Sequence, residues 1–224
     1  MGSPALLFDL DGTLVDSVYQ HVLAWQDALR ESGIELSVWR IHRRIGMSGG
    51  LFLNALFRET GRKLTGHQAQ KLSRHHGEVF SRLAGQIRPL PGARELIAFL
   101  SERKVPWAIA TSGRLQSAQP LLNMLAVPRS VPVITRDMVK HAKPDPDLFE
   151  MAAERLGVSM GQSFVVGDSV WDLLAARRGG ALGIGVLSGG YGLDELQAAG
   201  AYRVYQDPAD LLGRLDEIGV RESL

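Results

Sequence analysis

Cysteine is absent from this sequence of 224 residues. Disulfide bonds, a thiolate nucleophile and metal sites built on cysteine are therefore excluded. The sequence also lacks an apolar run of the roughly 18 residues that a membrane-spanning helix needs. Its first residues show neither the basic end nor the cleavage site of a signal peptide. We therefore expect no membrane span and, by default, a cytoplasmic location.

An excess of one charge is lacking as well. The 25 Lys and Arg residues balance 24 Asp and Glu residues, for a formal net charge of +1. The basic residues are scattered along the chain and form no stripe, so neither nucleic acid nor an anionic membrane surface is expected as a partner. The hydrophobic share of 45% suits a compact protein with one large core or two unequal domains.

Strand signals are missing from a long stretch in the first half, residues 16–88. Apolar residues recur there at helical spacing, which predicts helices at about 18–32, 36–44, 49–60 and 65–85. A short apolar run at 5–8 precedes this stretch and is typical of a buried strand.

Helices and strands alternate in the rest of the chain. Strands are predicted at 105–110, 131–134, 163–166, 182–187 and 202–205, and helices at 93–103, 115–125, 146–156, 170–178, 193–199 and 208–218. This alternation indicates an α/β fold, a Rossmann-like parallel sheet with helices on both faces. We therefore expect a core domain of residues 1–15 and 89–224 with an all-α domain, residues 16–88, inserted into it.

Polar residues follow four of the predicted strands, where sheets of this kind gather their ligands. They are Asp9 and Asp11 after the first strand, Thr111 and Ser112 after the second, Lys143 after the third, and Asp168 and Asp172 after the fourth. Each group alone has a structural explanation, as a capped turn or a helix N-terminus. Four such groups in this order favour one site.

The residue types suit phosphoryl transfer. That chemistry needs a nucleophile, positive charge for the phosphate oxygens and a proton donor for the leaving oxygen. Carboxylates fit a nucleophile, an acid–base group and the ligands of Mg²⁺. A lysine supplies a second positive charge, and a threonine hydroxyl with nearby amides supplies neutral donors.

The same four segments closely resemble the motifs of the haloacid dehalogenase-like (HAD) hydrolase superfamily. They are residues 8–17, 110–113, 143–147 and 167–172, and the segment 189–201 is similar to that family's final part. The helical insertion resembles the cap of the phosphoglycolate phosphatase and β-phosphoglucomutase branch. Such a cap would close over the site and exclude water.

This resemblance implies a role for each polar residue. Asp9 would attack phosphorus and form an aspartyl-phosphate, and Asp11 would protonate the leaving alcohol and then activate water. Thr111 would hold the phosphate, and Lys143 would steady both Asp9 and the transferred group.

The resemblance also implies a metal and a substrate site. Mg²⁺ would be bound by Asp9, the backbone carbonyl of Asp11, and Asp168, with Asp172 in support. The residues implied for substrate binding, besides Thr111, are Ser112, Gly113, His21, Gly46 and Met47. The expected partner is a small phosphorylated metabolite, a sugar phosphate or a phosphoglycolate-like acid, and the expected assembly is a monomer or homodimer.

Two alternatives stay open beside the phosphatase. The first is a β-phosphoglucomutase-like mutase, which the presence of Ile45 and Gly49 disfavours, because the mutase has a lysine and a phosphate-binding arginine there. Arg43 or Arg44 would have to substitute. The second is a phosphate-binding module without catalysis. A dehalogenase is disfavoured because those enzymes lack the carboxylate of Asp11.

Other conspicuous side chains have plainer interpretations. His42, His75 and His76 are expected to be surface or packing residues. The aromatic residues expected in the core of the helical insertion are Trp25, Trp39, Phe52 and Phe57.

Overall fold

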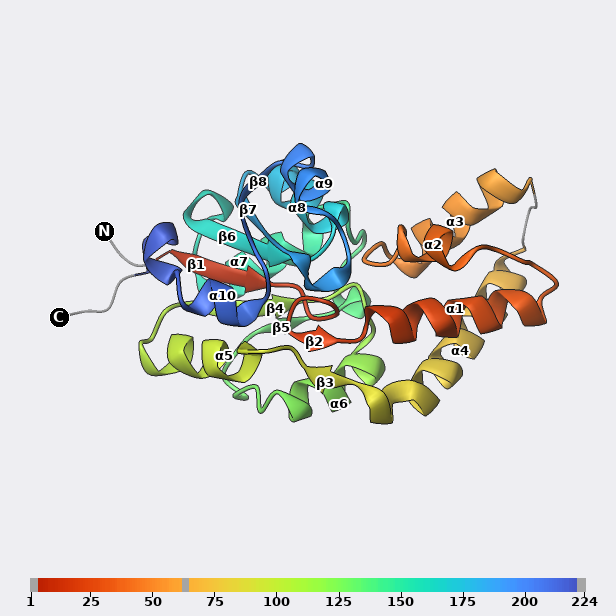
Figure 1. Ribbon diagram of the computed structural model, residues 1–224, viewed down its shortest axis with the longest axis horizontal. Helices are drawn as coiled ribbons and strands as arrows, with labels where there is room; N and C mark the ends of the chain where they lie inside the picture. The colour runs from red at the N-terminus through yellow and green to blue at the C-terminus, as the bar shows by residue number, and fades with distance from the viewer. Residues whose placement is uncertain (1–3, 62–64, 221–224) are drawn as a thin grey trace.

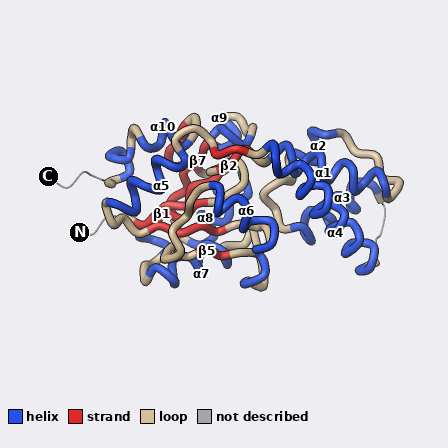
Figure 2. The backbone as a smooth tube through the Cα atoms, turned by 90° about the horizontal axis from the view of Figure 1, so that it is seen from below, coloured by secondary structure: helices blue, strands red, loops and turns tan. Residues whose placement is uncertain are grey.

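A six-stranded parallel sheet lies at the centre of the computed structural model, which describes residues 4–61 and 65–220. The strand order is β5-β4-β1-β6-β7-β8 (Figure 1), and Figure 2 shows the sheet surrounded by helices. The strands are β1 (Ala5–Phe8), β4 (Trp107–Ala110), β5 (Val133–Ile134), β6 (Ser163–Gly167), β7 (Leu182–Val186) and β8 (Ala201–Tyr205). All five strands predicted after residue 89, and the one before it, are confirmed.

The central strand β1 is buried along its whole length and pairs in parallel with β4 on one side and β6 on the other. Phe8, its last residue, lies level with Ile109 and Val166. Parallel strands in this register end at the same edge of the sheet. The loops that leave β1, β4 and β6 therefore begin side by side.

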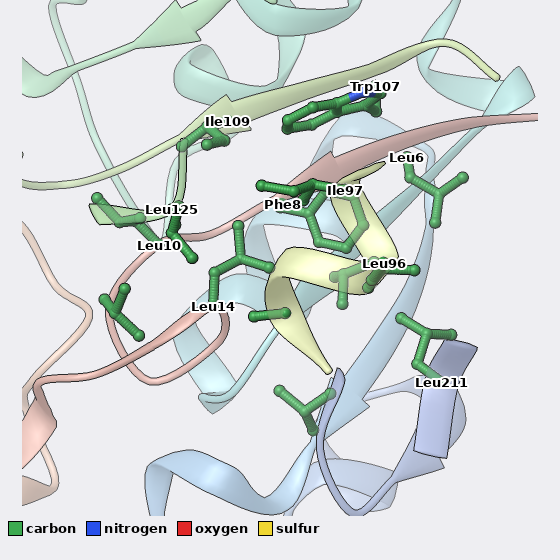
Figure 3. Close-up of a cluster of buried hydrophobic side chains, with 14 of the residues drawn as sticks. Leu6, Phe8, Leu10, Leu14, Leu96, Ile97, Trp107, Ile109, Leu125 and Leu211 are labelled. Atoms are coloured by element: carbon green, nitrogen blue, oxygen red, sulfur yellow. The ribbon is translucent and has the colours of Figure 1, made fainter. Parts of the chain in front are cut away.

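Helices cover both faces of this sheet, as predicted. The helices are α5 (Ala93–Glu102), α6 (Leu115–Met124), α7 (Asp147–Leu156), α8 (Val170–Gly179), α9 (Leu193–Ala198) and α10 (Pro208–Leu212). Successive strand side chains point to opposite faces, so Leu6 and Phe8 pack with Leu96 of α5 in one cluster (Figure 3). Leu7 packs with Phe149 of α7 in a second cluster on the other face.

In the described part of the chain, four helices form the block inserted after β1, and Figure 1 shows it beside the end of the sheet. They are α1 (Val18–Glu31), α2 (Val38–His42), α3 (Gly49–Thr60) and α4 (Gly66–Leu83). This block has an apolar cluster of its own, which includes Val22, Leu29 and Leu56. An antiparallel pair that the sequence analysis did not anticipate, β2 (Val15–Asp16) with β3 (Arg88–Pro89), joins the two ends of the block.

One expectation about packing is wrong. Trp39 is 62% exposed, with the Arg40 guanidinium over its ring, whereas Trp25 and Phe52 do lie in the core of the block. The short helix α2 buries Ile41, and Trp39, two positions earlier, lies about 200° around the helix axis from it.

The final helix is also shorter than predicted. α10 ends at Leu212, and a separate 3₁₀ turn follows at Leu215–Ile218. Within the part of the chain that the structure describes, no helix has both the length and the apolar character that crossing a bilayer requires.

Candidate active site

The polar residues predicted from the strand ends meet at one edge of the sheet. The backbone N–H of Asp9, the first residue after β1, donates to the carbonyl of Val166 in β6 at 2.8 Å. The N–H of Thr111, the first residue after β4, donates to the carbonyl of Ile134 at 2.9 Å. Both positions are thus fixed by hydrogen bonds that continue the sheet.

Lys143 reaches this edge from the loop before α7 and is completely buried. Its Nζ forms an ion pair with Asp9 and lies 2.8 Å from Asp172 Oδ1. Burial disfavours the charged amine, but the Asp172 and Asp9 carboxylates outweigh it and raise the pKa of Lys143 above its ordinary value. The site therefore contains one permanent positive charge between two carboxylates.

Asp9, Asp168 and Asp172 form a buried acidic trio in which each contributes an oxygen within 4.8 Å of the others. Burial raises the pKa of Asp9 to about 7, against the attraction of Lys143 and with a further contribution from Asp172. Burial, with contributions from the Asp172 and Asp9 carboxylates, raises the pKa of Asp168 well above its ordinary range. The three carboxyl groups outnumber Lys143, and carboxylate oxygens suit a hard divalent cation. The residues present therefore fit a divalent metal.

Asp168 is seated between two glycines. Thr13 Oγ1 donates to Asp168 Oδ1 at 3.2 Å. A Cβ atom at Gly12 would lie 2.6 Å from Asp168 Oδ2, and one at Gly189 would overlap that oxygen outright. The carboxylate occupies this place only because both positions lack a side chain.

Asp172 has a different environment from the other two members of the trio. Its Oδ2 accepts hydrogen bonds from the Ser169 amide at 3.1 Å and the Ser169 hydroxyl at 2.5 Å, which caps α8. Its Oδ1 faces Lys143. Asp172 thus links the start of α8 to the lysine, an arrangement that suits support of a metal better than direct ligation.

Asp11 lies two residues after Asp9 but outside the acidic trio. Its Oδ1 accepts a hydrogen bond from the Ser17 hydroxyl at 2.6 Å and lies 3.3 Å from His21 Nε2. Burial opposes the charged form, but His21 and then Ser17 outweigh it and lower the pKa of Asp11. Environment therefore moves the pKa values of Asp9 and Asp11 in opposite directions, which is how paired carboxylates come to have separate roles.

The loop after β4 meets the helical block at this edge. The Ser112 hydroxyl donates to the carbonyl of Gly46 at 3.0 Å, and the Gly113 amide donates to Thr111 Oγ1 at 3.0 Å. The Ser48 amide donates weakly to the carbonyl of Lys143 at 3.4 Å. The loop of residues 43–48 therefore lies directly over the carboxyl ends of the strands.

The structure thus brings together nearly all the residues singled out in the sequence. Asp9, Lys143, Asp168 and Asp172 form one cluster, with Asp11 and His21 beside it and Gly46 next to Ser112. Met47 lies half-buried in the same loop, where its amide donates to the carbonyl of Arg44 at 3.3 Å.

Sequence reasoning missed several residues that shape the site. Ser17 and Ser169 each hold a carboxylate, and the only signal for them is their position close to an aspartate in the chain. His42, expected to be a surface or packing residue, is 8% exposed, and its Nε2 lies 2.8 Å from the carbonyl of Gly189. Contacts of this kind join distant segments and leave no local pattern in the sequence.

Comparison with known proteins agrees with this geometry. The family described as haloacid dehalogenase-like hydrolase matches residues 4–180. The chain belongs to this family. The match includes all four motif segments and ends before the segment 189–201, whose resemblance to the family it does not test.

Three similar proteins share most of the chain. A hydrolase from Pseudomonas syringae is 52% identical, with a TM-score of 0.94, and the alignment covers 96% of this chain and 99% of that one. A probable phosphatase, IndB, from Dickeya dadantii is 32% identical over 88% of this chain and 86% of its own length. A phosphoglycolate phosphatase from Caulobacter vibrioides is 28% identical over 90% and 86%. The predicted family, the fold with its helical insertion, and an enzyme of the hydrolase class are confirmed.

Proposed function

We propose that this protein is a Mg²⁺-dependent phosphatase that hydrolyses small phosphorylated metabolites through an aspartyl-phosphate on Asp9. The observation that carries the proposal is the position of Asp9, a buried carboxylate that pairs with Lys143 and belongs to the acidic trio. A nucleophile in this setting has a lysine ready to neutralise the charge of an incoming phosphate.

In the proposed first step, an Asp9 oxygen attacks phosphorus, and the bond from phosphorus to the leaving oxygen breaks. The phosphoryl group passes to Asp9, and Asp11 gives its proton to the departing alcohol. Lys143 keeps Asp9 oriented and stabilises the charge on the transferred group.

In the second step, water attacks phosphorus and releases inorganic phosphate from Asp9. Asp11 takes a proton from that water, which restores its starting protonation for the next turnover. The lowered pKa of Asp11 supports this second role, as a base.

Asp9, Asp168 and the backbone carbonyl of Asp11 would hold Mg²⁺, with Asp172 in support. When bound, the cation would supply positive charge to the phosphate oxygens. The acidic trio supports a cation there, and Mg²⁺ is the hard ion that oxygen ligands and a phosphate together favour.

Thr111, Ser112 and Gly113 are the proposed phosphate-binding residues, since their loop starts level with Asp9.

We assign residues 16–88 to a cap domain and the rest to the core domain. Gly46, Met47 and His21 are then the cap residues nearest to the substrate, because the loop with Gly46 touches Ser112 and His21 touches Asp11.

A second phosphate site, which a mutase needs, has little support. The Arg43 guanidinium pairs with Glu195 at 2.9 Å and lies over the Tyr191 ring. The Arg44 guanidinium donates to the carbonyl of Arg40 at 2.6 Å. Both cations that would have to replace the mutase's arginine are therefore engaged within the protein.

A binding module without catalysis is also disfavoured, because the residues proposed as nucleophile and acid–base group lie beside Lys143 and the acidic trio. The names of similar proteins support the proposed substrate class, since one is a phosphoglycolate phosphatase and another a fructose-1-phosphate phosphatase. A small phosphorylated acid or sugar, handled by a cytoplasmic monomer or homodimer, completes the proposal.

The test is phosphate release with Mg²⁺ from para-nitrophenyl phosphate and from a panel of phosphorylated sugars and organic acids. Wild type should release phosphate, and Asp9→Asn should lose on the order of 10⁵-fold in turnover while keeping its fold. Interconversion of hexose 1- and 6-phosphates without net phosphate release would instead favour the mutase. If the wild-type protein cleaves no substrate of the panel, the result would favour a phosphate-binding module without catalysis.

A further inference from the structure

Behind Asp11, two helices of the inserted block meet through a stack of aromatic and histidine rings. His21 and Trp25 lie four residues apart on α1, and His76 and Phe80 lie four apart on α4. Residues at this spacing share one helix face, and α1 and α4 run alongside each other in Figures 1 and 2. These two faces therefore pack against each other.

The rings interleave in a definite order. The His21 ring lies 3.9 Å from the Phe80 ring at an angle of 5°, and the His76 ring lies 4.2 Å from the Trp25 ring at 18°. His21 Nδ1 and His76 Nε2 are 3.1 Å apart, which is hydrogen-bond distance. The stack fixes both imidazoles in plane, so that this hydrogen bond has one geometry.

The other nitrogen of His21 faces Asp11, since Nε2 lies 3.3 Å from Oδ1. A continuous path thus runs from Asp11 through both nitrogens of His21 to His76. The Ser17 hydroxyl donates a hydrogen bond to the same carboxylate oxygen. With Oδ1 taken by two donors, Oδ2 is left as the oxygen that exchanges a proton with substrate.

We propose that His76 is a positioning residue for Asp11: its hydrogen bond to His21 Nδ1 keeps the His21 Nε2–H directed at the carboxylate. The inference rests on the proposed function, in which Asp11 carries the proton. It assigns a role to a residue of α4 that touches neither the acidic trio nor Asp11 directly.

A neutral imidazole at His76 can either donate a hydrogen bond to His21 or accept one from it. Burial and the nearby His21 hold the pKa of His76 well below its ordinary value, so His76 is neutral near pH 7. A neutral imidazole has one N–H and one lone pair and can present either at Nε2 by changing tautomer. If His21 is neutral, His76 donates to its Nδ1; if His21 is charged, His76 accepts from it. In both states the Nε2–H of His21 points at Asp11.

Without a partner at Nδ1, a neutral His21 also populates the tautomer with its lone pair toward the Asp11 carboxylate. That tautomer repels the carboxylate and releases Oδ1. The orientation of Asp11 would then vary, and proton transfer to the leaving oxygen would suffer, because general acid catalysis requires the donor within hydrogen-bond reach.

Two substitutions separate the hydrogen bond from the ring stack. His76→Phe keeps an aromatic ring against Trp25 but removes the partner of His21. His76→Gln places an amide, which can donate or accept, close to the position of Nε2. His75→Phe is the matched control, because the neighbouring histidine faces Glu31, with Nδ1 at 2.8 Å from that carboxylate.

The readout is kcat/KM for two substrates that differ in their need for a proton. β-Glycerophosphate has an alkoxide leaving group that Asp11 must protonate. The 2,4-dinitrophenolate of 2,4-dinitrophenyl phosphate departs without a proton. We expect His76→Phe to lower kcat/KM for β-glycerophosphate about tenfold and kcat/KM for 2,4-dinitrophenyl phosphate by less than about twofold. The tenfold loss is part of the 10²–10⁴-fold that general acid catalysis contributes. His76→Gln should restore most of the loss, and His75→Phe should change neither value.

An equal fall for both substrates in His76→Phe, or no rescue by His76→Gln, would overturn the proposal and leave His76 as a packing residue. Asp11→Asn is the reference variant for the proposed function, and it should lower kcat/KM for β-glycerophosphate far more than for 2,4-dinitrophenyl phosphate. If wild type cleaves neither phosphate, the proposed function itself fails.

Nitrogen-15 NMR of the histidine rings tests the proposal on the wild-type protein alone. The expected spectrum has a hydrogen on His21 Nε2 and a neutral His76. A hydrogen on His21 Nδ1 alone, with Nε2 bare, would contradict the proposal whatever the variants do.

Discussion

The edge of the sheet and the inserted helical block build their parts of the site by different means. At the sheet edge, Asp9 and Thr111 are placed by backbone hydrogen bonds to neighbouring strands. In the helical block, His21 and His76 are placed by ring stacking between two helices. The first arrangement tolerates little movement, since the strands have a fixed register.

This difference indicates a division of labour. The sheet holds the charged groups, a lysine and three buried carboxylates, where displacement of any one would leave the others unpaired. The inserted segment contacts Asp11 through Ser17 and His21, and it contacts the loop after β4 through Gly46. Changes at the sheet edge should therefore cost far more than changes in the block, and the following substitutions probe that contrast.

The largest effect is expected at Lys143. Lys143→Met leaves the buried carboxylates of Asp9 and Asp172 without their cation, which should destabilise the fold by about 3–5 kcal/mol. Turnover should fall on the order of 10³-fold. Urea unfolding and steady-state kinetics measure the two effects. Lys140→Met, on an exposed side chain three residues earlier, is the control. Normal turnover in the Lys143 variant would contradict the assigned site.

A smaller effect is expected from crowding Asp168. Gly189→Ala puts a methyl group into the space of the Asp168 carboxylate, so Mg²⁺ affinity should weaken about tenfold. Isothermal titration measures this. Gly161→Ala is the matched control, because a Cβ there meets no atom within 4 Å. Unchanged affinity in Gly189→Ala would show that Asp168 does not hold the metal as described.

Metal affinity should also depend on pH. The pKa of Asp9 is raised to about 7, so its carboxyl takes up a proton as the pH falls through that value. A cation must displace this proton and any proton on Asp168, whose pKa is also raised, so the apparent Mg²⁺ affinity should weaken at least about tenfold for each pH unit below 7. Titrations at pH 8, 7 and 6 test the sign, and equal affinity at all three would be the contrary result.

The smallest effect is expected where the two regions touch at the surface. Arg43 and Glu195 form a pair whose side chains are 39% and 42% exposed, so the ion pair should contribute under about 1 kcal/mol. Glu195→Gln should raise KM about two- to threefold and leave kcat unchanged. A large fall in kcat would mean that the helical block is held to the sheet mainly by this pair.

The same contrast explains how far the sequence could be interpreted. The strands and the acidic motifs carry local signals, because apolar runs that stop at polar residues fix both the element and the position of the side chain. Asp9, Asp11, Lys143 and Asp168 could be predicted from the sequence for this reason. Asp172 could be predicted as well, although its carboxylate contacts Lys143 and Ser169.

The contacts between distant segments had no such signal. The two-residue strands β2 and β3 are too short to show alternation, and the exposure of Trp39 depends on which face of a five-residue helix is covered. The partnership of His21 with His76 depends on how α1 crosses α4, which residue spacing alone does not determine.

The most direct test of the account is capture of the phosphorylated intermediate. Wild-type protein is mixed with Mg²⁺ and 2,4-dinitrophenyl phosphate, quenched with acid within the first turnover and analysed by peptide mass spectrometry. The account predicts a single phosphoryl group on Asp9 that disappears as substrate is exhausted and is absent from Asp9→Asn. Phosphate release without any phosphorylated Asp9, or a phosphoryl group on another residue, would contradict it.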